Sequence, residues 1–153
     1  MLFEFGNFCV DVDVARTKAF YNKSEKTVLV DCGCINCRNY YNAISKVPDK
    51  VKEFFNALGI DPLKTPEATW WDTDEKGIAY YSIYFHIAGT LVKSAEIYRS
   101  IGDGSFALIP ENLYEIDKGF EAAFTSETAF LEKDFPTPCI QLEIHAHLPL
   151  VDE

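Results

Sequence analysis

Hydrophobic and polar residues alternate near the start of the chain, where every second position from Phe8 to Val14 is hydrophobic. A period of two predicts a β-strand with one buried face. The valine-rich run from Thr27 to Asp31 predicts a second strand, and a cluster of cysteines follows it directly.

Two helices are expected in the next part of the chain. Arg38 to Ser45 is predicted to be helical, directly after the cysteines. Pro48 then begins a second helix, at a position where the missing N–H of proline costs nothing. Gly59 ends this helix, and its hydrophobic stripe consists of Val51, Phe54, Phe55 and Leu58.

Antiparallel hairpins dominate the second half of the chain. Glu67 to Trp71 is expected to pair with Ile78 to Val92 across the polar residues 72–77. A second hairpin is expected to join Asn112 to Ile116 with Phe120 to Thr125, because the Asp-Lys-Gly sequence between them suits a short hairpin loop.

The last predicted strand runs from Cys139 to Leu148, and Pro136 and Pro138 precede it. The chain contains no internal repeat and no low-complexity linker. Residues 1–153 are therefore expected to form a single α+β domain, with a mostly antiparallel β-sheet and a two-helix layer packed on one face. A doubly wound parallel sheet is not expected, because strands and helices do not alternate throughout.

Charge and length restrict the partners. The chain has 153 residues, with 14 Lys and Arg against 24 Asp and Glu, which gives a formal net charge of −10. No basic cluster is present to contact phosphates, so neither a nucleic acid nor an anionic membrane is expected as a partner. The absence of a long apolar run and of a basic leader predicts a cytoplasmic protein.

Three of the five cysteines lie within six residues, at Cys32, Cys34 and Cys37. Three thiolates at this spacing could bind zinc, which takes four ligands in structural sites. The fourth ligand would have to come from a distant residue, and the candidates are Cys9, Cys139, His86, His145 and His147.

Two other interpretations of the cluster remain open. Cys34 and Cys37 form a C-x-x-C pair before a helix, where a thiolate is favoured, so thiol redox chemistry is one alternative. The other is structural: the cysteines are small packed residues in a tight strand-to-helix turn that Gly33 permits. The sequence favours the structural interpretation, because a second pair of metal ligands is absent.

The segment Cys34 to Tyr40, with the sequence CINCRNY, is followed by FFNALGIDP at Phe54 to Pro62. These segments resemble a group of small uncharacterised bacterial proteins that carry a C-x-x-C-R-N-Y motif followed by L-G-I-D-P. The resemblance implies a bacterial or phage-borne cytoplasmic origin. It implies no activity, because none is attached to that group.

Polar side chains share one face of the last strand, opposite a hydrophobic face. A partly solvated strand would show this pattern, and so would a metal-dependent site around His145 and His147. If the strand that contains His86 lies beside the last strand, the two faces form an aromatic groove for a planar small molecule or a peptide. The candidate ligand-binding residues are Tyr80, Tyr84, His86, Glu143, His145 and His147.

No catalytic motif is recognisable, whether a Gly-rich phosphate loop, a nucleophile elbow or a His-Glu-x-x-His zinc motif. An enzyme is therefore not favoured, and no cofactor other than zinc is suggested. Because 14% of the residues are aromatic and the net charge is −10, we expect a non-catalytic binding protein that engages another protein or a second copy of itself. Zinc binding and thiol redox chemistry are the alternatives.

Overall fold

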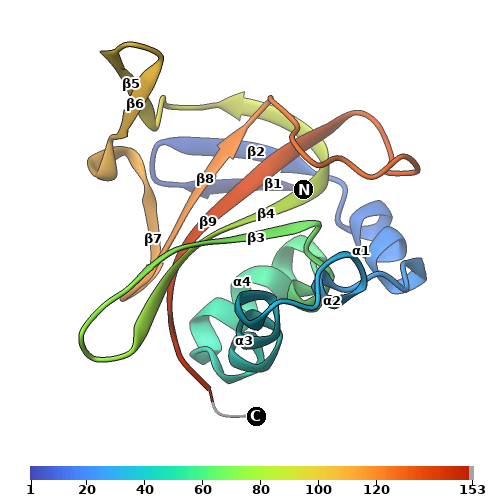
Figure 1. Cartoon of the computed structure of the whole chain (residues 1–153). Coiled ribbons are helices and arrows are strands. Elements are labelled where there is room, and N and C mark those ends of the chain that lie inside the picture. The colour runs from blue at the N-terminus through green and yellow to red at the C-terminus, as the bar shows by residue number, and fades with distance from the viewer. Residues whose placement is uncertain (152–153) are drawn as a thin grey trace.

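The computed structural model of the chain describes residues 1–151, and at residues 30 and 31 it describes the backbone alone. Seven strands form one antiparallel sheet in the order β1-β2-β4-β9-β8-β7, and β3 pairs with the first half of β4 (Figure 1). These strands are β1 (Leu2–Phe5), β2 (Phe8–Val12), β3 (Glu67–Thr73), β4 (Ile78–Lys93), β7 (Tyr114–Asp117), β8 (Phe120–Thr125) and β9 (Cys139–Pro149).

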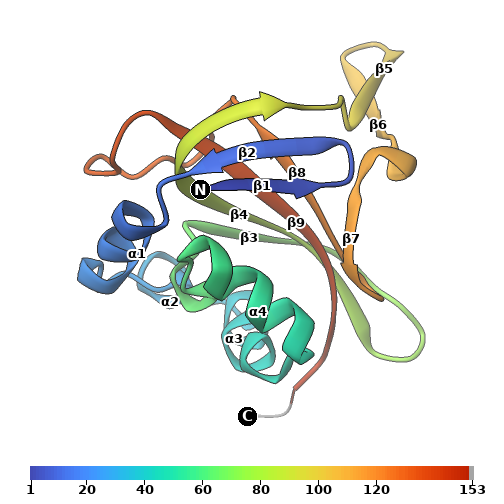
Figure 2. The same ribbon diagram turned by 180° about the vertical axis from the view of Figure 1, so that it is seen from behind.

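The helices pack against one face of this sheet (Figure 2). They are α1 (Val14–Lys23), the single turn α2 (Val28–Asp31), α3 (Ile35–Ala43) and α4 (Asp49–Leu58). The predicted α+β class, with a mostly antiparallel sheet and helices on one face, is confirmed. The helical layer also includes α1, so three helices contact the sheet.

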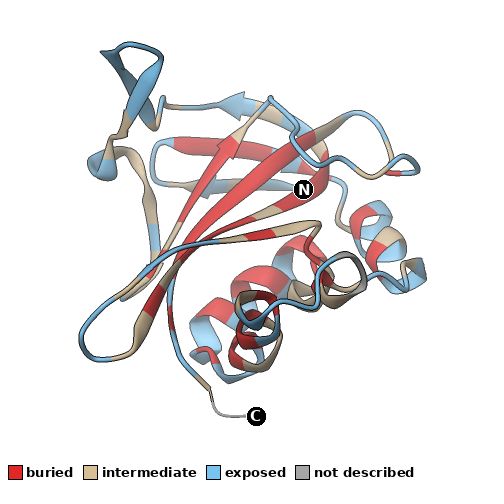
Figure 3. Ribbon diagram, viewed as in Figure 1, coloured by how far each residue is buried: buried red, intermediate tan, exposed pale blue. Residues whose placement is uncertain are grey.

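Hydrophobic residues of β4 and β9 form the centre of the core between the sheet and the helices. Tyr81 and Phe85 on β4 and Leu142 on β9 are fully buried. The ring of Phe55 on α4 lies 5.1 Å from that of Phe85, and the ring of Tyr40 on α3 lies 6.1 Å from that of Tyr81. Figure 3 shows the buried residues concentrated along the central strands and on the helix faces turned toward them.

The predicted helix after Pro48 is α4, and Gly59 ends it in the left-handed conformation with φ +82°. A Cβ atom at Gly59 would lie 2.8 Å from the carbonyl oxygen of Val14. Glycine therefore allows the end of α4 to approach the start of α1 closely. The two predicted hairpins are also confirmed, as β3–β4 and β7–β8, and the last predicted strand is β9.

Two predictions at the N-terminal end are wrong. The run from Thr27 to Asp31 is not a strand, because Val28 begins the helical turn α2 and is buried in the core. The hydrophobic character of Val28 reflects burial in the core rather than strand pairing. The alternating pattern ends at Val12, and Val14 begins α1, whose first turn is capped by the Asp13 carboxylate at 3.1 Å from the Arg16 nitrogen.

A small separate hairpin, β5 (Tyr98–Gly102) and β6 (Ser105–Leu108), extends from the sheet at the upper left of Figure 1. It was not expected from the sequence. The short 3-10 helices are η1 (Ile44–Lys46), η2 (Pro62–Lys64) and η3 (Pro110–Asn112). No helix within residues 1–151 combines the length and the apolar character that crossing a bilayer requires.

Candidate functional site

The cysteine cluster lies where α2 leads into α3. Cys32 follows the last residue of α2, Cys34 is the N-cap residue of α3, and Cys37 lies in the first turn of α3. The three sulfur atoms all lie within 4.8 Å of one another. Cys32 and Cys34 are exposed, whereas Cys37 is buried. The thiols therefore converge at the protein surface, with one of them reaching into the core.

The start of α3 gives the thiols of Cys34 and Cys37 different pKa values. The Sγ atom of Cys34 accepts a hydrogen bond from the backbone nitrogen of Cys37 at 3.5 Å, in the place of the usual serine or aspartate cap. Hydrogen bonding from the Cys32 side chain, and then from the Cys37 backbone, lowers the pKa of Cys34 to about 7. Burial, and then hydrogen bonding to Cys32 and Cys34, raises the pKa of Cys37.

Cys32, Cys34 and Cys37 could hold a metal ion, and among the side chains that the structure describes no other group of three His, Cys, Asp or Glu ligands converges in this way. The distant residues considered as a fourth ligand do not join them. They lie on strands of the sheet: Cys9 on β2, His86 on β4, and Cys139, His145 and His147 on β9. A site with four protein ligands is therefore not assembled from the described side chains.

The turn that contains the cluster also differs from the one expected. It joins two helices rather than a strand and a helix, because residues 28–31 are helical. Gly33 does not adopt a left-handed conformation, and a Cβ atom placed on it would meet nothing within 4 Å. The turn therefore does not require glycine at position 33.

The two polar faces considered in the sequence do meet. Strands β4 and β9 pair in a register that sets Ser82 opposite His145 and Tyr84 opposite Glu143. The expectation of a partly solvated strand is wrong, however, because Glu143 and His145 are only 6% and 4% exposed. Residues 126–135 cover part of this face, where the backbone nitrogen of Ala129 donates to the Gln141 side chain at 2.6 Å.

A chain of four hydrogen-bonded side chains runs across this buried face. The Tyr80 hydroxyl lies 2.5 Å from His145 Nδ1, and His145 Nε2 lies 2.7 Å from Glu143 Oε2. The Tyr98 hydroxyl donates to the same Glu143 oxygen at 2.7 Å. Burial opposes ionisation of Glu143, but hydrogen bonds from His145 and Tyr98 outweigh it, and the pKa of this carboxyl lies below its usual value.

The remaining candidate residues occupy different positions around this chain. His147 is exposed, and its ring lies edge-on to Tyr80 at 5.1 Å. Tyr84 is partly buried and contacts the ring of Phe130, whereas His86 is buried against Phe135. Burial raises the pKa of Tyr84 to about 12. The six candidates thus share one face, but they do not open into one groove.

Tyr98 is a member of this constellation that the sequence did not indicate. It lies at the start of the exposed hairpin β5–β6, 45 positions before Glu143. Neither its periodicity nor its neighbours mark it as a partner of a buried carboxylate. Only the folding of the hairpin connection over β9 brings the two groups together.

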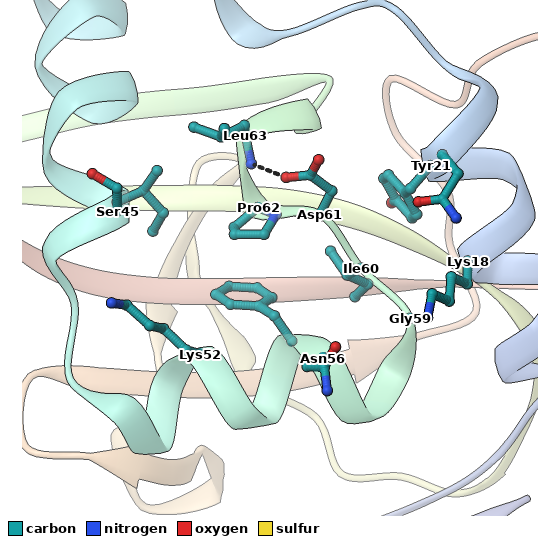
Figure 4. Close-up of a pocket in the computed structure, with 13 residues that line it drawn as sticks. Lys18, Tyr21, Ser45, Lys52, Asn56, Gly59, Ile60, Asp61, Pro62 and Leu63 are labelled. Carbon is teal, nitrogen blue, oxygen red and sulfur yellow. Dashed lines mark hydrogen bonds between the residues drawn. The ribbon is translucent and has the colours of Figure 1, made fainter.

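A cavity of about 470 Å³ lies between α1, α4 and residues 59–63 (Figure 4). Two of its polar side chains, Tyr21 and Asp61, hold the fold together through hydrogen bonds to the backbone. The Tyr21 hydroxyl donates to the carbonyl oxygen of His86 at 2.9 Å, and Asp61 accepts from the Leu63 nitrogen at 3.1 Å. We therefore regard the cysteine cluster as the stronger candidate site.

The chain was also compared with known proteins. Neither protein families, nor curated proteins, nor solved structures gave a match to it. The resemblance noted at Cys34 to Tyr40 and Phe54 to Pro62 therefore stays a prediction, and the function has to be argued from the site.

Proposed function

We propose that this chain is a metal-binding protein that holds one zinc ion on the thiolates of Cys32, Cys34 and Cys37. The observation that carries this proposal is the convergence of the three sulfur atoms within 4.8 Å. Thiolate sulfur is one of the ligands that zinc prefers in proteins, and zinc itself has no redox role. The proposed function is binding, with no catalytic step assigned to the chain.

The dimensions of the cluster support this proposal. Zinc–sulfur bonds of about 2.3 Å place neighbouring sulfurs of a tetrahedral site about 3.8 Å apart. The sulfurs would have to come closer by at most about 1 Å. Cys32 and Cys34 are exposed and can rotate inward, while Cys37 is held in the first turn of α3. Small side-chain movements would therefore complete the arrangement.

The different pKa values of Cys34 and Cys37 predict that zinc binding depends on pH. Cys34, whose pKa is about 7, supplies a thiolate near neutral pH. Cys37 has a raised pKa and has to lose its proton when the metal binds. Because metal binding releases protons, we expect the affinity for zinc to increase as the pH rises.

Three protein ligands leave one position on the metal open. Sites of this kind hold a water molecule or an exchangeable ligand, whereas purely structural zinc sites are usually closed by four protein ligands. The open position would face solvent, since Cys32 and Cys34 are exposed.

The exposed side chains of Ile35, Trp70 and Leu150 line a nearby cavity of about 490 Å³, where the predicted protein partner could contact the chain.

The test is elemental analysis of untagged protein that is purified without chelators. We expect about one zinc per chain, and replacement of any of the three cysteines by serine should lower the content sharply. Cys139→Ser is the matched control, because Cys139 lies on β9 outside the cluster, and it should retain the metal. Less than about 0.2 zinc per chain in the wild-type protein would exclude a tight thiolate site.

A second candidate function uses the same segment. Cys34 is exposed at the start of a helix, and Cys37 is buried three residues later. In this arrangement an attacking thiolate precedes a protected resolving thiol, as dithiol redox proteins require. The reaction would join Cys34 and Cys37 in a disulfide, and two electrons and two protons would pass to a disulfide substrate, which becomes two thiols.

Cys32 distinguishes the two candidates. Zinc binding needs all three sulfurs, so Cys32→Ser should lose the metal. Disulfide exchange needs only Cys34 and Cys37, so the same variant should still reduce a model disulfide, as judged by thiol titration. A wild-type protein that binds zinc, and whose Cys32→Ser variant neither binds zinc nor exchanges disulfides, would support the metal site alone.

A further inference from the structure

We propose that residues 126–138, the connection from β8 to β9, form a pH-sensitive strap that opens when the imidazole of His86 beneath it takes up a proton. This connection is the long loop at the upper right of Figure 1. The inference does not depend on the cysteine cluster, which lies at the start of α3.

His86 is the buried group that the strap covers. It lies on β4 directly opposite Gln141 of β9, and only 1% of it is exposed. The ring of Phe135, in the strap, lies 5.7 Å from the imidazole ring. Among the residues that the structure describes, His86 Nε2 is the one buried side-chain nitrogen or oxygen atom without a hydrogen-bond partner. Buried polar atoms almost always have a partner, so this atom is an exception that needs an explanation.

A neutral imidazole can occupy this position, but an imidazolium cannot occupy it without a large cost. Both ring nitrogens of an imidazolium are donors, so Nε2 would become the N–H donor of a charged ring, beside Phe135 and without an acceptor. Burial of an unpaired charge costs far more than burial of a neutral polar group. The imidazolium is therefore more stable when the strap is displaced and water reaches Nε2.

The charged and titratable groups around His86 do not relieve this cost. Burial lowers the pKa of His86, and interactions with the Ala129 backbone and the Gln141 side chain oppose it only in part. None of these influences is a neighbouring charge. The groups on the surrounding elements are Arg16 and Tyr21 on α1, Lys64 on η2, Glu67 on β3, Tyr84 on β4, Cys139 and Glu143 on β9, and Glu127, Glu132, Lys133 and Asp134 in the strap.

Side chains and one backbone group hold the strap in its closed position. The backbone nitrogen of Ala129 donates to the Gln141 side chain at 2.6 Å. The ring of Phe135 lies 4.6 Å from that of Phe20 on α1. These contacts fasten the strap directly over His86, so a charge that forms there acts against the closed position.

Two features of the strap lower the cost of opening it. Phe130 adopts the left-handed conformation with φ +60°, which is strained for a residue other than glycine. A cavity of about 700 Å³ lies between residues 130–134 and the end of α1, so this part of the strap is not closely packed on the helix. Opening would also separate Phe130 from Tyr84, whose rings lie 5.7 Å apart. The open form would therefore present an aromatic surface that the closed form covers.

The direction of the pH dependence follows from proton linkage. With the strap open, the pKa of His86 returns to its ordinary value of 6.5, whereas the closed strap lowers it. The closed form is therefore most stable above pH 6.5, and it loses stability as the pH falls below this value. The ratio of open to closed molecules should rise by at most about tenfold for each pH unit.

The experiment is hydrogen exchange of the whole protein between pH 5 and pH 8, measured by mass spectrometry. Protection factors remove the pH dependence of the exchange chemistry itself. Protection of residues 126–138 should fall several-fold between pH 7 and pH 5, while protection of α4 stays unchanged. Ordinary carboxyl groups, with pKa values of about 4, titrate mostly below this range.

Two variants assign the effect to His86. His86→Phe removes the titrating group and keeps a ring against Phe135, so the strap should stay protected down to pH 5. His147→Gln is the matched control, because His147 is an exposed histidine of β9, and its strap should open as in the wild type.

Titration of the imidazole resonances of the wild-type protein by NMR decides the question even if His86→Phe fails to fold. His86 should titrate below pH 6.5, in the pH range in which the strap loses protection. The proposal is overturned if His86 titrates at or above pH 6.5, or if protection of residues 126–138 does not depend on pH. It is also overturned if the strap of His86→Phe opens as that of the wild type does, or if opening follows the titration of His145 or His147 instead.

Discussion

The hydrogen bond between Cys32 and Cys34 should set the reactivity of the cluster. It is the largest cause of the lowered pKa of Cys34, which lies at about 7 instead of the ordinary 9.0. The perturbation is Cys32→Ala, which removes this hydrogen bond and leaves the Cys37 backbone nitrogen in place. We expect the pKa of Cys34 to rise from about 7 toward 9, so that less thiolate is present at neutral pH.

The magnitude follows from the two pKa values. At pH 7 about half of the Cys34 thiols are ionised, against about 1% for a thiol with a pKa of 9, a ratio of about 50. A thiolate with a pKa lower by about two units is intrinsically less nucleophilic, by about six- to tenfold. Cys34 in the wild-type protein should therefore react about five- to eightfold faster at pH 7 than an ordinary thiol.

The assay is alkylation of the metal-free protein by iodoacetamide between pH 5.5 and 9.5, with Cys34 and Cys139 followed separately by mass spectrometry of their peptides. Cys139 is an internal reference, because burial raises its pKa. The rate at Cys34 should have its inflection near pH 7 in the wild type and higher in Cys32→Ala. An inflection near pH 9 in the wild type, or one that does not move in the variant, would refute the reasoning.

Three further predictions concern stability. The pKa of Glu143 is lowered in the folded state, so its stabilising contribution is present above pH 4.5 and is lost as the pH falls below that value. In Glu143→Gln the free energy of unfolding should therefore fall less steeply at acidic pH than in the wild type, and an unchanged pH dependence would contradict this. Asn39 makes three hydrogen bonds: its side-chain nitrogen donates to the Tyr81 hydroxyl and to the Pro149 carbonyl oxygen, and its side-chain oxygen accepts from the Val151 nitrogen. Asn39→Ala should therefore lower the free energy of unfolding in urea by about 1–3 kcal/mol and increase hydrogen exchange at residues 149–151. Gly59→Ala should lower the free energy of unfolding in urea by about 3 kcal/mol, because its Cβ atom would lie 2.8 Å from a backbone oxygen. Gly77→Ala, with open space around its Cβ atom, should lower it by about 1 kcal/mol, and equal losses in the two variants would contradict the close contact at Gly59.

Several elements could be predicted from the sequence because they depend on neighbouring residues. The hydrophobic stripe and the terminal Gly59 identify α4 without knowledge of its partners. The alternation from Cys139 to Leu148 identifies β9, and it also places Glu143 and His145 on one face. The proximity of the three thiols likewise follows from their short spacing in the sequence. The helical turn α2 before them could not be predicted, because Val28 to Asp31 has the composition of a strand.

Tertiary structure alone decided whether the polar face of β9 is solvated or buried. Alternation shows that two faces differ, but it does not show what covers each of them. Residues 126–135 and Tyr98 come from separate parts of the chain, follow no period and meet Glu143 and His86 only after folding. The same folding kept His145 and His147 away from the cysteines. Contacts between distant segments are set by the packing of the whole sheet, so the sequence determined the candidate groups and the fold determined which of them act together.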